Sequence, residues 1–296
     1  MRSKVNQVFD VLKSNESKES KVTKLIELGI NENEVHELFA LYETEDDVLY
    51  TIGVEIECFG LNKTRFNELC VAKGIDIQTE SYNHDTKPHF KVVCDSSIQG
   101  EAAIECVTPV LRNKAGFDNL EKVCDALNEA GAKVNKSTGL HVHVGLQNVD
   151  FETYKNCFIN YHYLEPAIDK FMANSRRGNN NAYCRSLINR GIDINRIINA
   201  QNMQEIEDVF VSDRYYKLNP VSYSRHNTLE FRQHQGTTDY KKIYKWVMLL
   251  TSFVAWSKKH RLTSHITSID AIPAGIIDKK FKNYYNKRAA ELNGVA

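Results

Sequence analysis

Apolar and polar residues alternate in three short segments that lie far apart in the chain. The segments are 52–57, 140–145 and 228–232. In each one, apolar side chains occupy every second position, and acidic, basic, imidazole or small residues occupy most positions between them. Because successive side chains of a β-strand point to opposite faces, each segment predicts a strand with one apolar and one polar face. If the three strands share a sheet, its polar face carries carboxylates, imidazoles and an arginine.

The rest of the hydrophobic pattern predicts further strands and helices. The predicted strands are 48–59, 90–94, 102–108, 133–136 leading into 140–145, and 221–223 paired with 228–233. The predicted helices are 62–72, 117–130, 243–259 and most of the stretch from 151 to about 210. Strands and helices mixed in this order indicate an α+β fold, and short connections between adjacent strands favour an antiparallel sheet.

Residues 1–47 predict a helical appendage that ends in the acidic linker 43–47, and 48–296 predict the main domain. Apolar residues recur at helical spacing near the N-terminus, and two more short helices are predicted on either side of 29–31. Short amphipathic helices commonly pack as part of a core. The appendage therefore either packs on the main domain or binds a protein partner, and the sequence leaves both alternatives open.

The charge of the chain is balanced overall but unevenly distributed. The 296 residues include 38 Lys and Arg and 38 Asp and Glu, so the net charge is zero. Nucleic-acid binding usually needs a basic face, so this balance argues against it. Residues 1–50 contain 6 basic and 11 acidic residues, which leaves the remainder with a charge of +5. A mildly basic main domain is compatible with a small ligand that carries phosphate.

Cysteine use and hydropathy predict a cytoplasmic protein. The chain has 7 cysteines, an odd number, and no Cys-x-x-Cys pair, which argues against a zinc ribbon. We therefore interpret them as reduced thiols of a cytoplasmic protein. The first residues lack the apolar core of a secretion signal, and no apolar stretch is long enough to span a membrane.

Acidic residues on two of the predicted strands indicate a metal site. Glu55 and Glu57 lie about 7 Å apart on one strand face and repel each other unless a cation neutralises them. Magnesium prefers such carboxylate oxygens. Glu105 follows the same logic on a face that it shares with Glu101 and Ala103. The alternative for all these carboxylates is a solvated strand with surface salt bridges.

The His-x-His segment is compatible with metal binding of more than one kind. His141 and His143 share one strand face next to Gly145. Zinc would require further nitrogen or sulfur ligands close by. With carboxylates as companions, magnesium or manganese fits better. A neutral imidazole could also donate a hydrogen bond to phosphate, and the alternative is a purely structural role.

Arginines supply candidate phosphate ligands. Arg232 follows Glu230 by two residues, and its guanidinium matches the oxygens of a phosphoryl group, whereas a salt bridge is the structural alternative. Arg176 and Arg177 lie in a Gly- and Asn-rich loop that could close over a ligand, and Arg225 is a further candidate. The chain has no glycine-rich phosphate loop. A nucleotide would therefore have to be bound by metal and side chains on the sheet.

The order of these motifs resembles that of the amidoligase family, within the carboxylate–amine ligase superfamily of glutamine synthetase and glutamate–cysteine ligase. The resemblance extends over about residues 48–260 and leaves out the appendage. It rests on five short motifs in order, at 53–57 (GVEIE), 95–98 (DSSI), 104–110 (IECVTPV), 137–145 (STGLHVHVG) and 227–232 (NTLEFR) with 236–237 (GT).

The resemblance implies a curved antiparallel sheet of the glutamine synthetase catalytic-domain type, with ATP and magnesium or manganese as cofactors. Its motifs imply that five residues bind metal: Glu55, Glu57, Glu105, His143 and Glu230. They also imply that Arg232 stabilises the transferred phosphate, that Asp95 orients the substrate and that Arg176 takes part in catalysis. His141, Arg177 and Arg225 are then further candidates for binding the nucleotide, with His141 as the alternative metal ligand. The resemblance also suggests a bacterial or phage source.

The sequence thus favours an ATP-dependent ligase that joins a carboxylate to an amine through an acyl phosphate. Its substrates would be small molecules or peptides. A phosphotransferase on the same fold would use the same metals without an amine. A metal-dependent hydrolase is compatible with His-x-His plus acids. A non-catalytic binding or inhibitory protein, acting through residues 1–47, is the alternative from another class.

Overall fold

The computed structural model describes residues 7–8, 11, 14, 16–31, 35, 50–147 and 149–294. The chain divides into two units, Met1–Leu49 with Arg112–Ala115 and Tyr50–Leu111 with Gly116–Ala296. The functional division after residue 47 stays a prediction. None of the helices in the described residues combines the length and apolarity needed to cross a bilayer.

The first unit contains helix α2, Lys18–Glu27, which lies within the predicted helical appendage. The Ser17 side chain accepts a hydrogen bond from the Ser20 amide and so caps the first turn. Leu25 and Val35 are buried against partly buried aliphatic side chains. The predicted helix positions Val5, Phe9 and Leu12 and the linker 43–47 lie outside the described residues.

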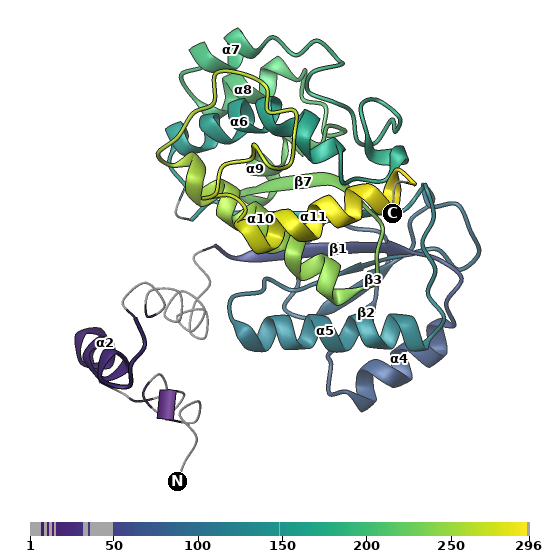
Figure 1. The fold of residues 1–296 in the computed structure, drawn as a ribbon. Coiled ribbons are helices and arrows are strands. Elements are labelled where there is room, and N and C mark those ends of the chain that lie inside the picture. The colour runs from purple at the N-terminus through teal and green to yellow at the C-terminus, as the bar shows by residue number, and fades with distance from the viewer. Residues whose placement is uncertain are drawn as a thin grey trace. The chain divides into compact units, whose positions relative to one another are not determined.

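The second unit is built on a seven-stranded sheet of order β2-β3-β4-β1-β5-β7-β6 (Figure 1). The strands are β1 Ile52–Cys58, β2 Ile77–Thr79, β3 Phe90–Val93, β4 Ile104–Val107, β5 Gly139–Gly145, β6 Leu218–Asn219 and β7 Thr228–Gln235. Only the β2–β3 pair is parallel among the pairs within this sheet. This confirms the α+β class with a mostly antiparallel sheet. The sheet is open, with β2 and β6 at its edges, and the curvature expected from the resemblance stays a prediction.

Helices surround the sheet, and several begin at a side-chain cap. They are α4 Lys63–Ala72, α5 Lys114–Glu129, α6 Phe151–Asp169, the 3-10 helix η2 Asn174–Arg176, α7 Ile194–Asn199, α8 Met203–Val209, α9 Ser222–His226, α10 Tyr240–Ser257 and α11 Lys279–Leu292. Asn62, Asp150 and Asp239 each accept hydrogen bonds from amides of the first turn of α4, α6 and α10. Such caps satisfy amide groups that have no partner within the helix, so they fix where each helix begins.

The apolar face of the sheet packs against α6 and α10. Phe231 of β7 contacts Tyr161 of α6 and Phe253 of α10, with ring centroids 5.6 and 5.9 Å apart. Val54 and Val142, on the neighbouring strands β1 and β5, are fully buried. Burial of this face against helices leaves the opposite, polar face to form a pocket.

Two predicted strands are wrong. Residues 222–226 form α9, and Leu218–Asn219 pairs with β7 in place of 221–223. Asn227 adopts a left-handed conformation (φ 54°) that ends α9 and redirects the chain into β7. Residues 133–136 do not lead into a strand, since Lys133 makes a single bridge to Phe59 and β5 begins at Gly139 after a turn.

The predicted helical middle is right only in part. Helix α6 fills 151–169, but the following segment 170–193 contains η2 and is otherwise irregular until α7. The short edge strand β2 and the C-terminal helix α11 were not predicted from the sequence pattern. The irregular segment matters because it carries Arg176 and Tyr183 to the pocket described next.

Candidate active site

Strand register brings the predicted acidic and imidazole residues onto one face. Glu57 of β1 lies opposite Glu105 of β4, and Glu55 lies opposite His141 of β5. His143 in turn lies opposite Glu230 of β7. Because directly opposed residues of antiparallel strands share a face, six side chains from four adjacent strands converge. We call them the carboxylate–histidine cluster: Glu55, Glu57, Glu105, His141, His143 and Glu230.

A β-bulge in β7 lies opposite His141, at Arg232 and Gln233. The register shifts between Leu140 and Val142, which pair with His234 and Phe231, so two residues of β7 oppose His141 alone. Arg232 points to the pocket, whereas the other bulge residue, Gln233, is buried and accepts a hydrogen bond from the Tyr161 hydroxyl at 2.5 Å. Arg232 and Gln233 therefore lie opposite the same residue of β5, one in the pocket lining and the other buried.

The polar face forms a pocket of about 600 Å³. It is lined by the cluster and by Tyr82, His84, Cys94, Asp95, Ser96, Ser97, Ser137, Arg176, Tyr183, Arg214, Tyr215, Asn219, Ser222, Arg225, His226 and Arg232. Every site residue predicted from the sequence is present except Arg177. The guanidinium of Arg177 donates to the Met172 carbonyl and to the Asn293 side chain, both at 2.8 Å, away from the pocket lining.

Glu55 lies at the centre of the cluster. Its two carboxylate oxygens contact Nδ1 of His141 at 2.9 Å and Nε2 of His143 at 3.2 Å. Burial acts to raise the pKa of Glu55, but these hydrogen bonds from the two imidazoles bring it well below its usual range. Glu55 is therefore a carboxylate at neutral pH, and its charge is available to a cation.

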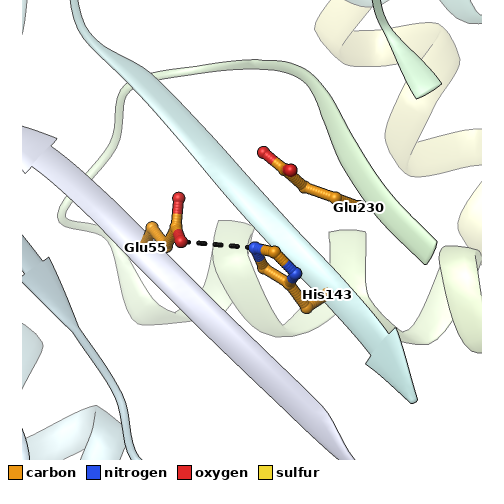
Figure 2. Close-up of side chains that lie close together, drawn as sticks. All are labelled: Glu55, His143 and Glu230. Atoms are coloured by element: carbon orange, nitrogen blue, oxygen red, sulfur yellow. Dashed lines mark hydrogen bonds and ion pairs between the residues drawn. The ribbon is translucent and has the colours of Figure 1, made fainter. Parts of the chain in front are cut away.

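Two groups of three side chains have the geometry of a metal site, and Glu55 belongs to both. One group is Glu55 with His143 and Glu230 (Figure 2), and the other is Glu55 with Glu105 and His141. In each group the three ligand atoms lie within 4.8 Å of one another. Oxygen ligands with one imidazole fit magnesium or manganese better than zinc.

The carboxylates of the cluster carry more negative charge than the neighbouring positive groups neutralise, and Glu105 is the residue affected most. Burial and the charges of Glu55 and Glu57 raise the pKa of Glu105 well above its ordinary value. One proton therefore stays in the cluster at a pH where an exposed glutamate would have lost it. A divalent cation would displace that proton, so the donor set fits a metal ion.

Replacing Glu105 with Gln is expected to raise the Tm of the metal-free protein at neutral pH. Because its pKa is raised by folding, the folded protein retains a proton that the unfolded chain releases. Stability therefore falls as the pH rises from the ordinary carboxyl pKa towards the raised value, and Gln removes this fall. Thermal unfolding from about pH 4 to pH 8, with exposed Glu121→Gln as control, measures it. If the Tm of wild type and of Glu105→Gln changed with pH in parallel, the pKa of Glu105 would not be raised by folding.

Arg232 is paired with Glu230 on the same strand. Nη1 of Arg232 donates to a Glu230 oxygen, and the Asn219 side chain donates to the other. Burial alone would raise the pKa of Glu230, but the charge of Arg232, with a smaller contribution from His143, lowers it to about 2. Arg232 Nε also donates to the Tyr183 carbonyl at 3.3 Å. The guanidinium is thus fixed beside a candidate metal site, where it could bind a phosphate.

Arg176 is a buried cation at the other side of His141. Only 2 % of Arg176 is exposed, its Nη2 donates weakly to the Ser137 carbonyl at 3.4 Å, and its buried Nε has no hydrogen-bond partner in the described residues. Gly139 leaves room for it, because a Cβ there would lie 2.9 Å from His141 Nε2 and 3.0 Å from Arg176 Nη2. Asp95 lines the pocket from the turn after β3, where it accepts the Ser97 amide at 2.7 Å.

Several lining residues were missed because they lie outside regular strands. Tyr82 and His84 come from the loop between β2 and β3, and Arg214 and Tyr215 from the turn before β6. One signal was present in the sequence, a lysine inside the apolar strand 90–94. Lys91 is 3 % exposed, and its Nζ donates to both oxygens of Asn83 and to the Asp85 carbonyl at 2.7–3.1 Å. It anchors the loop that brings Tyr82 and His84 to the pocket.

Comparison with models of known protein families places the chain in one of them. A family model described as "Putative amidoligase enzyme" matches residues 49–254, a span that contains every strand of the sheet and every lining residue of the pocket. Among curated proteins, no sequence matches the chain. The family match covers more than half of the chain, and its span contains all five motifs, which lie between residues 53 and 237. This protein therefore belongs to the amidoligase family.

Proposed function

We propose that this protein is an ATP-dependent ligase that joins a carboxylate to an amine. The family supports ligase chemistry. The observation that carries the proposal is the convergence of two overlapping candidate metal groups on Glu55, with Arg232 beside them in the same pocket. Carboxylates that hold a metal ion and a fixed guanidinium are groups that can stabilise the charge of phosphoryl transfer. A sheet of the glutamine synthetase type belongs to the same proposal.

Divalent cations would be held by Glu55, Glu105, His143 and Glu230 of the two groups, with Glu57 as a further ligand and His141 as the alternative imidazole. When bound, magnesium would supply positive charge that offsets the negative charge of a polyphosphate. Glu57 is already oriented for this role, because its Oε2 accepts the Gly139 amide at 2.6 Å. The imidazoles of His141 and His143 in turn fix the position of Glu55.

In the proposed reaction a substrate carboxylate oxygen attacks the γ-phosphorus of ATP, and the bond to the β–γ bridging oxygen breaks to release ADP. The amine nitrogen then attacks the acyl carbon and loses a proton, and the carbon–oxygen bond to phosphate breaks. Arg232, fixed by Glu230, would bind the transferred phosphoryl oxygens as their charge increases. Arg176 would favour anionic intermediates near His141, and Asp95 would orient a substrate from the edge of the pocket.

The size of the pocket and the state of the cysteines support proposals about the substrates and the cellular compartment. The carboxylate and the amine are proposed to be small molecules or peptide ends, in keeping with a pocket of about 600 Å³. All seven cysteines are free in the structure, which supports a reducing, cytoplasmic setting. A protein partner for residues 1–47 stays a further proposal.

Magnesium with a non-hydrolysable ATP analogue is expected to raise the Tm of the wild type and not that of Glu57→Gln. A ligand that binds only the folded state stabilises it by an amount that grows with the logarithm of its concentration relative to the dissociation constant. Gln removes a charge of the proposed metal site and so raises that constant. Thermal unfolding with nucleotide at about 100 times the dissociation constant measures the shift. Glu121→Gln, on the exposed face of α5, serves as the control and should shift like the wild type. No shift in wild type would contradict nucleotide binding at this pocket.

A further inference from the structure

One end of the pocket carries Arg214, a positive charge that the proposed reaction does not use, in addition to Arg232, which it does use. The carboxylates of the cluster lie mainly on β4 and β1, whereas Arg232 lies on β7 and Arg214 in the turn before β6. Both arginines stack on Tyr215, with guanidinium carbons 5.1 Å (Arg214) and 5.7 Å (Arg232) from its ring centroid. Two like charges on one ring repel each other, so an anion bound beside both would relieve an unfavourable contact.

Contacts with Arg185 hold the turn that carries Arg214 in place. Arg185 forms an ion pair with Asp213, its amide donates to the Tyr215 carbonyl at 2.8 Å, and its guanidinium lies 5.0 Å from the Tyr216 ring centroid. The residues that Arg185 contacts come directly before and after Arg214 in the sequence. The position of its backbone is therefore set by the fold, independently of what the guanidinium binds.

The partners of the Arg214 guanidinium are all neutral. Nη1 lies 3.3 Å from Nε2 of His84, and Nη2 donates to the Tyr215 hydroxyl at 3.4 Å. The Tyr82 hydroxyl, which is also neutral, helps to raise the pKa of Arg214. Burial and the charge of Arg214 lower the pKa of His84, so this imidazole is uncharged at neutral pH. Within the part of the chain that the structure describes, Arg214 forms no ion pair, in contrast to Arg232 with Glu230.

We propose that Arg214 binds a phosphate group of the nucleotide, and that this contact replaces its hydrogen bond to His84. The inference rests on the proposed function and adds a residue to it. A guanidinium whose partners are neutral retains its full charge for a ligand, and its fork geometry matches phosphate oxygens. The contacts with His84 are long and easily exchanged, whereas those that fix the turn are not. A bridge that merely joins two loops is the alternative.

Equilibrium binding of two magnesium-loaded probes tests this assignment, a non-hydrolysable ATP analogue and inorganic tripolyphosphate. Arg214→Met keeps the aliphatic stem and removes the charge. It is expected to lower the affinity for both probes about 10- to 100-fold. Arg214→Lys keeps the charge but lacks the forked guanidinium, so its affinity for both probes should lie between those of Arg214→Met and the wild type. His84→Ala should change affinity by less than about threefold, because the contact it loses is the one that phosphate replaces. Arg190→Met, exposed and away from the pocket, is the matched control.

The outcomes separate this inference from the function on which it rests. If wild type binds both probes and Arg214→Met binds them equally well, the inference is wrong and the proposed function stands. If Arg214→Met weakens binding of the ATP analogue but not of tripolyphosphate, Arg214 does not bind phosphate. If Arg214→Met and His84→Ala lower the Tm alike without changing affinity, the contact is a structural bridge. If wild type binds neither probe, the proposed function itself is wrong.

Discussion

Replacing Glu55 with Gln is expected to reduce ATP-dependent amide formation by at least about 100- to 1,000-fold, the scale seen when one preorganised electrostatic group is removed from an active site. Glu55 belongs to both candidate metal groups, so its loss weakens each of them. Glutamine keeps the size and one oxygen, but it removes the charge that the imidazoles of His141 and His143 stabilise. The loss should therefore appear in turnover more than in folding.

ADP release measured with and without an amine reports this effect, and a thermal unfolding curve shows that the variant is folded. Glu55→Asp retains the charge but moves the oxygens by about one bond length, and is expected to keep more activity than Gln. Glu121→Gln, on the exposed surface of α5, should behave as wild type. Turnover of Glu55→Gln within a few-fold of wild type would rule out the carboxylate–histidine cluster as the catalytic centre.

Replacing Lys217 with Met is expected to destabilise the protein by about 3–5 kcal/mol. The Lys217 ammonium is fully buried and contacts Glu165 at 2.8 Å and Asp169 at 2.7 Å. Although burial acts to lower the pKa of Lys217, the charges of these two carboxylates raise it, so the group is charged. Removing the ammonium leaves two carboxylates in a poorly hydrated site without their cation.

The same buried network positions part of the pocket. Glu165 accepts hydrogen bonds from the Ser186 hydroxyl and the Leu187 amide, and Asp169 accepts one from the Gly178 amide. These contacts tie the irregular segment that contains Arg176 to α6. The Lys217→Met variant is therefore expected to lower both the Tm, by on the order of 10 °C, and the affinity for magnesium and nucleotide.

Urea unfolding of Lys217→Met gives the free-energy change directly. The double variant Lys217→Met with Glu165→Gln is the matched control, because it removes one of the two uncompensated charges. It is expected to recover part of the lost stability, as coupled groups do in a double-mutant cycle. If the double variant were less stable than the single one by the full cost of a separate mutation, the two groups would not be coupled.

The strands of the site could be predicted because their side chains alternate in type. Glu55, His143 and Glu230 each lie between buried aliphatic or aromatic neighbours, and a period of two is sufficient to place them on one face. The register that brings them together could not be read from the sequence. In particular, the bulge opposite His141 depends on how Arg232 and Gln233 pack, and no local pattern marks it.

Apart from Asp95, Arg176 and Arg225, the rest of the pocket could not be predicted from the sequence, because irregular segments have no periodicity. Arg176 and Arg177 are neighbours in the chain, yet one is buried in the pocket lining and the other bonds to the end of α11. Arg214 was missed for the same reason. Residues 221–223 look like a strand by composition, but the left-handed Asn227 makes a helical turn possible there.

Hydroxylamine, a small amine that attacks acyl phosphates, can trap the product of the first half-reaction and so tests the proposed ligase activity. The protein would be incubated with ATP, magnesium and a pool of amino acids, short peptides and small carboxylic acids, and ADP and hydroxamate would be measured together. We expect one hydroxamate for each ADP, formed only when the carboxylate pool is present and lost in Glu55→Gln. ADP release with a stable phosphorylated product and no hydroxamate would contradict a ligase and indicate a phosphotransferase.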